Sequence, residues 1–169
     1  MTLTDPNTVE FKRSRLIYAL FAFGMIACFV SYGIIFLSGF IALLFGIALA
    51  YRDRKRGKNT IYLAHQNWQI HTFWLGNLVA FPIAMIAHFI AIYMFTDFSV
   101  LVTEASSGNM GTDIAAMEAR YIAFQTENLP TLVLTKWLTY GLALLWWLYR
   151  CNFGYRQLKK GLPPKVETV

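Results

Sequence analysis

Two long stretches of the sequence contain no charged side chain. Residues 16–51 and residues 73–96 lack Asp, Glu, Lys and Arg altogether, and most of their side chains are apolar. Each stretch is longer than the roughly 18–20 apolar residues that cross the hydrocarbon core of a bilayer. The pattern therefore predicts membrane-spanning helices rather than the interior of a soluble domain.

The first stretch is too long for one span. As a single helix it would extend about 54 Å at 1.5 Å per residue, whereas the hydrocarbon core is only about 30 Å thick. Two spans over residues 16–32 and 36–51 fit better, and we expect them to turn near Ser31-Tyr32-Gly33 or near Ser38-Gly39. Upstream, Asn7-Thr8-Val9-Glu10 has the spacing of a capping box and predicts where the first helix begins.

Residues 59–72 mix polar and aromatic side chains, which is typical of a helix lying at the membrane surface. We expect such an interfacial helix here, carrying the residues His65, Trp68, Gln69 and His71. The next span then covers residues 73–95, with Trp74 as an interfacial anchor. Pro82 is expected to kink this span because proline cannot donate a backbone hydrogen bond.

Residues 96–129 break the apolar pattern and predict a loop on the outer side. The loop is acidic, with Asp97, Glu104, Asp113, Glu118 and Glu127 against one arginine. From Asp113 onward, apolar residues recur at helical spacing, which predicts a short amphipathic helix within the loop. Asn128-Leu129-Pro130 is then expected to open the last span, over residues 130–150, followed by a cytoplasmic tail at 151–169.

The basic residues indicate the orientation. Thirteen of the 15 Lys and Arg lie in residues 12–15, 52–58 and 150–165, which flank the predicted spans on one side, and Arg150 anchors the end of the last span. The positive-inside rule places these segments in the cytoplasm, with both termini. This asymmetry also accounts for the net charge of +6 without a nucleic-acid partner. We expect a multi-pass protein of the bacterial cytoplasmic (inner) membrane.

Composition agrees with this topology, since charged residues make up 14% of the chain and hydrophobic residues 57%. Soluble domains contain roughly 25% charged residues. The predicted fold is therefore an all-α integral membrane four-helix bundle formed by a single domain, residues 1–169. It comprises a helical hairpin, an interfacial helix and two further spans, with the amphipathic helix in the outer loop.

Several short motifs resemble an uncharacterised family of small bacterial four-helix membrane proteins. They are Ala50-Tyr51-Arg52, His65, Trp68-Gln69-Ile70-His71-Thr72-Phe73-Trp74, Trp147-Leu148-Tyr149-Arg150, Gly154 and Gly161-Leu162-Pro163. That family is distantly similar to the four-helix import component of the chloroplast inner envelope. The resemblance implies a four-helix fold and a membrane location, and the family has no established activity to transfer.

Candidate sites are few. Ser38, Ala42, Gly46 and Ala50 recur every four residues, a spacing that lets helices approach closely in lipid. They are expected to contact either a partner or the chain's own helices. His88 lies inside the third predicted span, where an ionisable group either has a function or is hydrogen-bonded to Thr135 or Tyr140. The spacing of the histidines and cysteines does not predict a metal site, and we expect no cofactor.

The sequence carries no nucleotide-binding loop and no hydrolase motif. The first hypothesis is therefore a non-enzymatic accessory or scaffold subunit of a larger membrane complex. It would contact lipids and other membrane subunits, or assemble as a homo-oligomer. Two alternatives stay open: an oligomeric channel or protein-translocation component, and a small redox or lipid-binding membrane protein.

Overall fold

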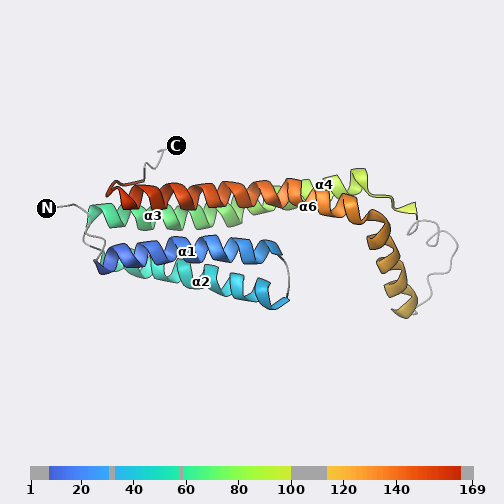
Figure 1. Ribbon diagram of the computed structural model, residues 1–169, viewed down its shortest axis with the longest axis horizontal. Coiled ribbons are helices and arrows are strands. Elements are labelled where there is room, and N and C mark those ends of the chain that lie inside the picture. The colour runs from blue at the N-terminus through green and yellow to red at the C-terminus, as the bar shows by residue number, and fades with distance from the viewer. Residues whose placement is uncertain (1–7, 31–32, 58, 100–113, 165–169) are drawn as a thin grey trace. The chain divides into compact units, whose positions relative to one another are not determined.

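The structure is a computed structural model that describes residues 8–30, 33–57, 59–99 and 114–164. They form the helices shown in Figure 1: α1 (Val9–Val30), α2 (Gly33–Arg56), α3 (Thr60–Leu75), η1 (Gly76–Ala80), α4 (Phe81–Phe95) and α6 (Ile114–Lys159). Four helices are long and apolar enough to cross a membrane: α1, α2, a continuous Thr60–Phe95 helix and Met117–Lys159. The predicted all-α fold with four membrane helices is confirmed, and the chain is a membrane protein.

The chain divides into two compact units, whereas the sequence pattern predicts a single domain. Unit 1 comprises Met1–Pro82 and Leu142–Val169, and unit 2 comprises Ile83–Gly141. Unit 1 therefore contains α1, α2, α3, η1 and the last part of α6. These helices form a four-helix bundle. Unit 2 contains most of α4 and the first part of α6.

Small residues set the close approach of α1 and α2 in unit 1. A Cβ atom added to Gly39 would lie 2.7 Å from the Cβ of Ala27 and 2.7 Å from the carbonyl oxygen of Gly24. Such tight packing is how helices associate in lipid, where apolar surfaces gain little by leaving the solvent. Since α1 ends at Val30 and α2 begins at Gly33, the first of the two predicted turn positions fits. The second, at residues 38–39, lies inside α2.

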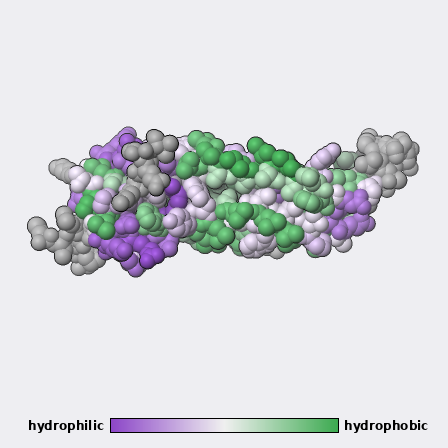
Figure 2. Space-filling view, turned by 90° about the horizontal axis from the view of Figure 1, so that it is seen from above, coloured by the Kyte–Doolittle hydropathy of each residue, from purple (hydrophilic) through white to green (hydrophobic). Residues whose placement is uncertain are grey.

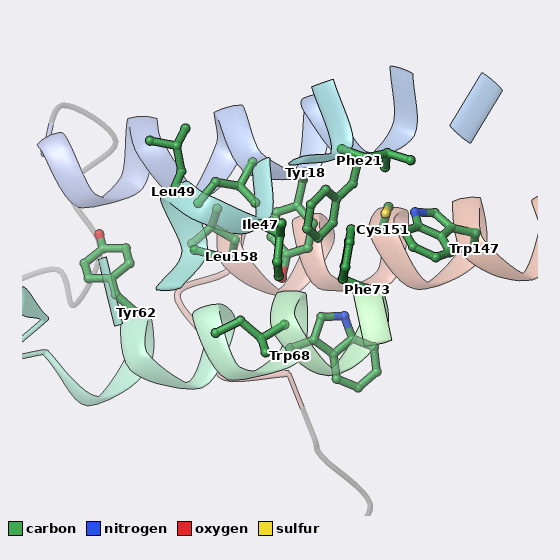
Figure 3. Packing of buried hydrophobic residues seen from close by; sticks show 14 of the residues in the cluster. Tyr18, Phe21, Ile47, Leu49, Tyr62, Trp68, Phe73, Trp147, Cys151 and Leu158 are labelled. Atoms are coloured by element: carbon green, nitrogen blue, oxygen red, sulfur yellow. The ribbon is translucent and has the colours of Figure 1, made fainter. Parts of the chain in front are cut away.

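An aromatic cluster fills the interior of unit 1, with side chains from all four helices (Figure 3). The ring of Phe21 on α1 lies 5.8 Å from that of Phe73 on α3 and 6.1 Å from that of Trp147 on α6, measured between centroids. α2 contributes Ile47 and Leu49. The Phe21–Trp147 pair is edge-to-face and the Phe21–Phe73 pair is tilted. Aromatic pairs at such separations stabilise the bundle beyond the burial of area.

The expectation of a separate interfacial helix at residues 59–72 is wrong. α3 begins after Asn59, whose side chain caps it by accepting from the backbone N–H of Ile61 at 2.9 Å. It then continues through η1 into α4, so that Thr60–Phe95 is one helix. η1 is a widened turn in which the N–H of Phe81 donates to the carbonyl of Gly76. This turn directly precedes Pro82, and the helix passes the proline without ending.

The last helix also differs from its predicted bounds, because Pro130 lies inside α6 rather than at its start. The amphipathic helix expected in the outer loop is the beginning of α6, and the expected tail is helical up to Lys159. Around the proline, side chains bond to backbone carbonyls: Thr126 donates to Ile122 at 2.7 Å and Asn128 to Phe124 at 3.1 Å. Figure 1 shows the ribbon of α6 changing direction in its ochre-to-orange part.

Some expectations fall on residues outside the described ranges, namely the capping residue Asn7 and the loop acids Glu104 and Asp113. At the start of α1, the side chain of Thr8 accepts from the backbone N–H of Phe11 at 3.3 Å. Thr8 therefore supplies the first cap of α1, one position after the residue that the capping-box pattern favours.

Candidate functional site

One end of unit 1 is hydrophilic. There the start of α1 meets the end of α2 and the start of α3: Arg13 lies 3.4 Å from the carboxylate of Asp53, and the hydroxyls of Thr8 and Tyr62 are 3.1 Å apart. Arg52 also pairs with Asp53, at 3.2 Å. Figure 2 shows hydrophilic residues gathered at this end and apolar residues beyond it. The helix ends that carry most of the basic residues therefore lie together.

Beside this end, α3 turns a row of polar side chains toward the interior. His65, Gln66, Gln69 and Thr72 are all buried, and His65 and Gln69 have no exposed surface. The spacing of His65, Gln69 and Thr72 keeps them on one face of the helix. A buried polar group is costly unless it is hydrogen-bonded, so the partners of this row decide how the bundle is held together. We call these four residues the polar row.

His65 joins three separate parts of the chain. Its Nδ1 lies 3.0 Å from the hydroxyl of Tyr18 on α1, and its Nε2 lies 3.0 Å from the carbonyl oxygen of Leu162. Because a carbonyl can only accept, Nε2 carries the proton, and in the neutral ring Nδ1 accepts from Tyr18. The histidine thus connects α1, α3 and the segment after α6.

The turn that presents Leu162 is a helix-ending motif. Gly161 adopts a φ of 67°, a left-handed conformation that favours glycine. The N–H of Gly161 donates to Leu158 at 3.1 Å and that of Leu162 to Gln157 at 3.0 Å, which is the pattern of a Schellman motif. The end of α6 therefore places the Leu162 carbonyl against His65.

Gln69 links α3 to α1 through the backbone. Its side-chain amide donates to the carbonyl oxygen of Ser14 at 3.0 Å. The Gln69 Oε1 and Ser14 Oγ atoms are buried and have no hydrogen-bond partner among the described residues, and the same holds for Gln66 Oε1. The polar row is therefore only partly satisfied by the protein itself.

Arg150, predicted as a cytoplasmic anchor, bonds to α3. Its guanidinium lies 3.9 Å from the centroid of the Trp68 ring, and its Nε donates to Thr72 Oγ1 at 3.1 Å. Trp68 returns a hydrogen bond from Nε1 to the Arg150 carbonyl at 3.3 Å. A planar guanidinium suits this arrangement, because it can stack on an aromatic ring while it donates in its own plane. Arg150 therefore fixes α6 to α3.

The remaining residues of the predicted interfacial segment lie at the surface. His71 is exposed, and its Nδ1 accepts from Arg150 at 3.4 Å. Trp74 is 43% exposed and donates from Nε1 to the hydroxyl of Tyr51 on α2 at 2.8 Å. His65 and His71 thus face different surroundings, in agreement with their spacing of six residues.

In unit 2, polar contacts among the described residues join α6 both to the segment after α4 and to α4 itself. Asn128 accepts from the backbone N–H of Asp97 at 2.8 Å and donates to the Asp97 carbonyl at 3.1 Å. The Asp97 carboxylate accepts from the N–H of Ser99 at 2.8 Å, and this bond holds the pKa of Asp97 below its usual value. These bonds fasten the end of α4 to α6 next to Pro130.

His88 is the second contact and is half-buried. It lies 3.4 Å from the Thr139 hydroxyl, and its ring centroid is 5.0 Å from that of Tyr140. A hydrogen bond to Thr135 or Tyr140 was expected, and the ring of Tyr140 packs against His88. The hydrogen bond goes to Thr139 rather than to Thr135, whose carbonyl accepts from Thr139 at 2.7 Å. No group of three or more His, Cys, Asp or Glu in the described part of the chain could hold a metal ion.

The small residues of α2 pack inside the hairpin. Ala42, Gly46 and Ala50 are buried, and a Cβ added to Gly46 would meet the Phe21 ring of α1 at 2.8 Å. Ser38 is exposed and donates to the Ile35 carbonyl at 2.7 Å within its own helix. The small residues were expected to contact either a partner or the chain's own helices. The three buried ones contact the chain's own helices.

Sequence reasoning missed Ser14, Tyr18 and Asp53. Asp53 stands between Arg52 and Arg54, so the sequence pattern around it is that of a basic segment. One signal could have found it, because it follows Gly46 and Ala50 along the same buried face of α2. Ser14 and Tyr18 carry no local signal, since their partners lie 47 or more residues away in the sequence.

Comparison with protein-family models, with curated proteins and with solved structures gives no match for this chain. The resemblance to the small bacterial membrane family therefore stays a prediction. Support for a function therefore comes from the structure of each unit taken by itself.

Proposed function

We propose that the chain is a non-enzymatic accessory or scaffold subunit of a larger membrane complex, and that unit 2 is the part that contacts other subunits. One observation carries the proposal: α4 buries very few of its side chains in the described part of the chain. Only Ala84 of α4 is buried, whereas α1 contributes seven buried residues and α2 eight. A helix with so little internal contact offers its faces to lipid or to other helices.

The exposed faces of unit 2 are large and aromatic. Tyr93 is 80% exposed, Phe95 66%, Phe89 63% and Trp137 60%. Large rigid rings give extensive packing at a small cost in conformational entropy, and they are enriched in protein interfaces. Unit 1 by contrast has its own aromatic core and internal hydrogen bonds, so it needs no partner to hold its helices together.

The proposal includes location and orientation: the bacterial cytoplasmic membrane, with the hydrophilic end of unit 1 and both termini in the cytoplasm. The clustering of the basic helix ends supports it through the positive-inside rule. Reporter fusions after Gly57 and after Ser99 test this orientation. Gly57 should report the cytoplasmic side and Ser99 the opposite side. Equal signals at both positions would refute the topology.

Site-specific crosslinking in native membranes tests the partner surface. A photoreactive residue in place of Ile86, which is 57% exposed on α4, should give an adduct with a second polypeptide. The matched control is the same replacement of Leu44, which is 47% exposed on the α2 hairpin of unit 1 and should label lipid. Native mass measurement after mild extraction should also show an assembly. A lone monomer with no Ile86 adduct would overturn the proposal.

A further inference from the structure

A groove of about 440 Å³ lies between α1 and the last part of α6 in unit 1. Four residues of α1 line one side and four of α6 the other. The lining residues are Arg15, Tyr18, Ala19, Ala22, Leu148, Cys151, Asn152 and Tyr155. Its size lies within the roughly 300–1,000 Å³ of small-molecule sites. Nothing in the polar row or in unit 2 takes part in it.

The groove is polar at one end and apolar at the other. α1 and α6 run in opposite directions here, because Tyr18 packs on Gly154 while Phe21, farther along α1, packs on Trp147. Arg15 therefore lies with Asn152 and Tyr155 at the hydrophilic end of unit 1, and Ala22 lies with Leu148 at the apolar end. Such a gradient matches an amphiphile whose head stays at the membrane surface.

The charge at the polar end selects the head group. Among the described residues, both ion pairs go to Asp53, from Arg13 and Arg52, so Arg15 has no carboxylate partner there. Lys159 lies at the same end, with its Nζ 4.8 Å from the centroid of the Tyr155 ring. Two cations and the neutral Asn152 amide favour an anionic head.

The floor of the groove is fixed rather than adaptable. Ala19 and Ala22 leave the space open because they are small. Tyr18 is held in place by its contact with Gly154 and its hydrogen bond with His65. Tyr18 is 4% exposed, so the packed interior of unit 1 forms the floor of the groove.

We propose that this groove binds an anionic phospholipid, with the phosphate at Arg15 and the upper part of one acyl chain along Ala19, Ala22 and Leu148. The site is independent of the contacts proposed for unit 2. It makes the lipid a bound component of unit 1 on the side of the membrane where the basic helix ends lie.

Lipid retention tests the site. The protein is exchanged into nanodiscs of phosphatidylglycerol or of phosphatidylcholine, extracted in mild detergent, and the retained lipid is counted by native mass spectrometry. The wild type should keep one phosphatidylglycerol in preference to phosphatidylcholine. Arg15→Gln should weaken that retention about fivefold, the effect of one basic residue at an anionic lipid surface. Ala22→Phe should abolish it by filling the apolar end.

Two controls match these variants outside the groove: Arg54→Gln and Ala48→Phe, both at exposed positions of α2. They should retain the lipid as the wild type does. Equal retention of the two lipids, or unchanged retention in Arg15→Gln, would overturn the proposal. Because Arg15 is exposed, Arg15→Gln should fold, and its lipid retention tests the proposal even if Ala22→Phe does not fold.

Discussion

Gly76→Ala is the substitution for which the structure makes the sharpest prediction. Gly76 begins the widened turn η1, and its α-carbon faces the Trp147 ring of α6. A Cβ atom at this position would overlap ring atoms of Trp147. The ring has no room to withdraw, because Trp147 is 1% exposed and packs against Phe21 and Phe73.

Two opposing effects set the magnitude. Overpacking a filled core costs about 1–3 kcal/mol, and the overlap with a fixed ring argues for the upper end. Replacing glycine by alanine inside a helix returns about 1 kcal/mol. The net loss is therefore about 2 kcal/mol, which lowers Tm by about 4–8 °C for a chain of this length.

Thermal unfolding in mild detergent, followed by size-exclusion chromatography, measures the change. Gly141→Ala is the matched control, because its Cβ would meet the Trp137 ring at an ordinary 3.6 Å. That variant should gain stability from the helix effect alone, about 1 kcal/mol. Gly76→Ala and Gly141→Ala with equal Tm values would refute the packing argument. Adding Trp147→Phe to Gly76→Ala should restore part of the loss.

Three further results are expected. His65→Ala removes both hydrogen bonds of the buried ring and should cost about 1–3 kcal/mol and speed proteolysis after α6, whereas exposed His71→Ala should do neither. Asn128→Ala should speed hydrogen exchange at the end of α4 with a similar loss, whereas exposed Asn67→Ala should not. The pKa of Asp97 is lowered in the folded protein because its carboxylate accepts from the N–H of Ser99. This hydrogen bond therefore stabilises the turn fully at pH values above the pKa of Asp97 in the unfolded chain. The protection of that amide from hydrogen exchange, after correction for the intrinsic pH dependence of exchange, should fall as the pH falls through the pKa of folded Asp97. A corrected protection factor that stays constant over this range would contradict the prediction.

The number of membrane helices could be predicted because the signal is local, whereas the third and fourth begin earlier than predicted. Uncharged stretches and basic flanks identify spans without reference to other helices, and the length of the first stretch requires a break in it, although only the structure places that break between Val30 and Gly33. Prolines were less informative. Pro82 and Pro130 both lie within continuous helices, Pro82 two residues after the widened turn η1 and Pro130 close to the side-chain bonds of Thr126 and Asn128.

The polar row could not be predicted as a buried site. Its alternation of polar and aromatic side chains is that of a surface helix, and only the fold shows that the polar face is the inner one. The partners of His65 lie on α1 and after α6, 47 and 97 residues away. No pattern within the segment carries that information.

The partners of His65 also imply an order of assembly during synthesis. Tyr18 precedes α3 in the chain, but Leu162 follows His65 by 97 residues. Ribosome-bound intermediates that lack the end of α6 therefore carry a half-satisfied histidine, together with a Trp68 that has not yet met Arg150. The bundle of unit 1 is complete only once α6 has been made, and a nascent chain stalled before residue 150 should remain open to rearrangement or to quality-control proteases.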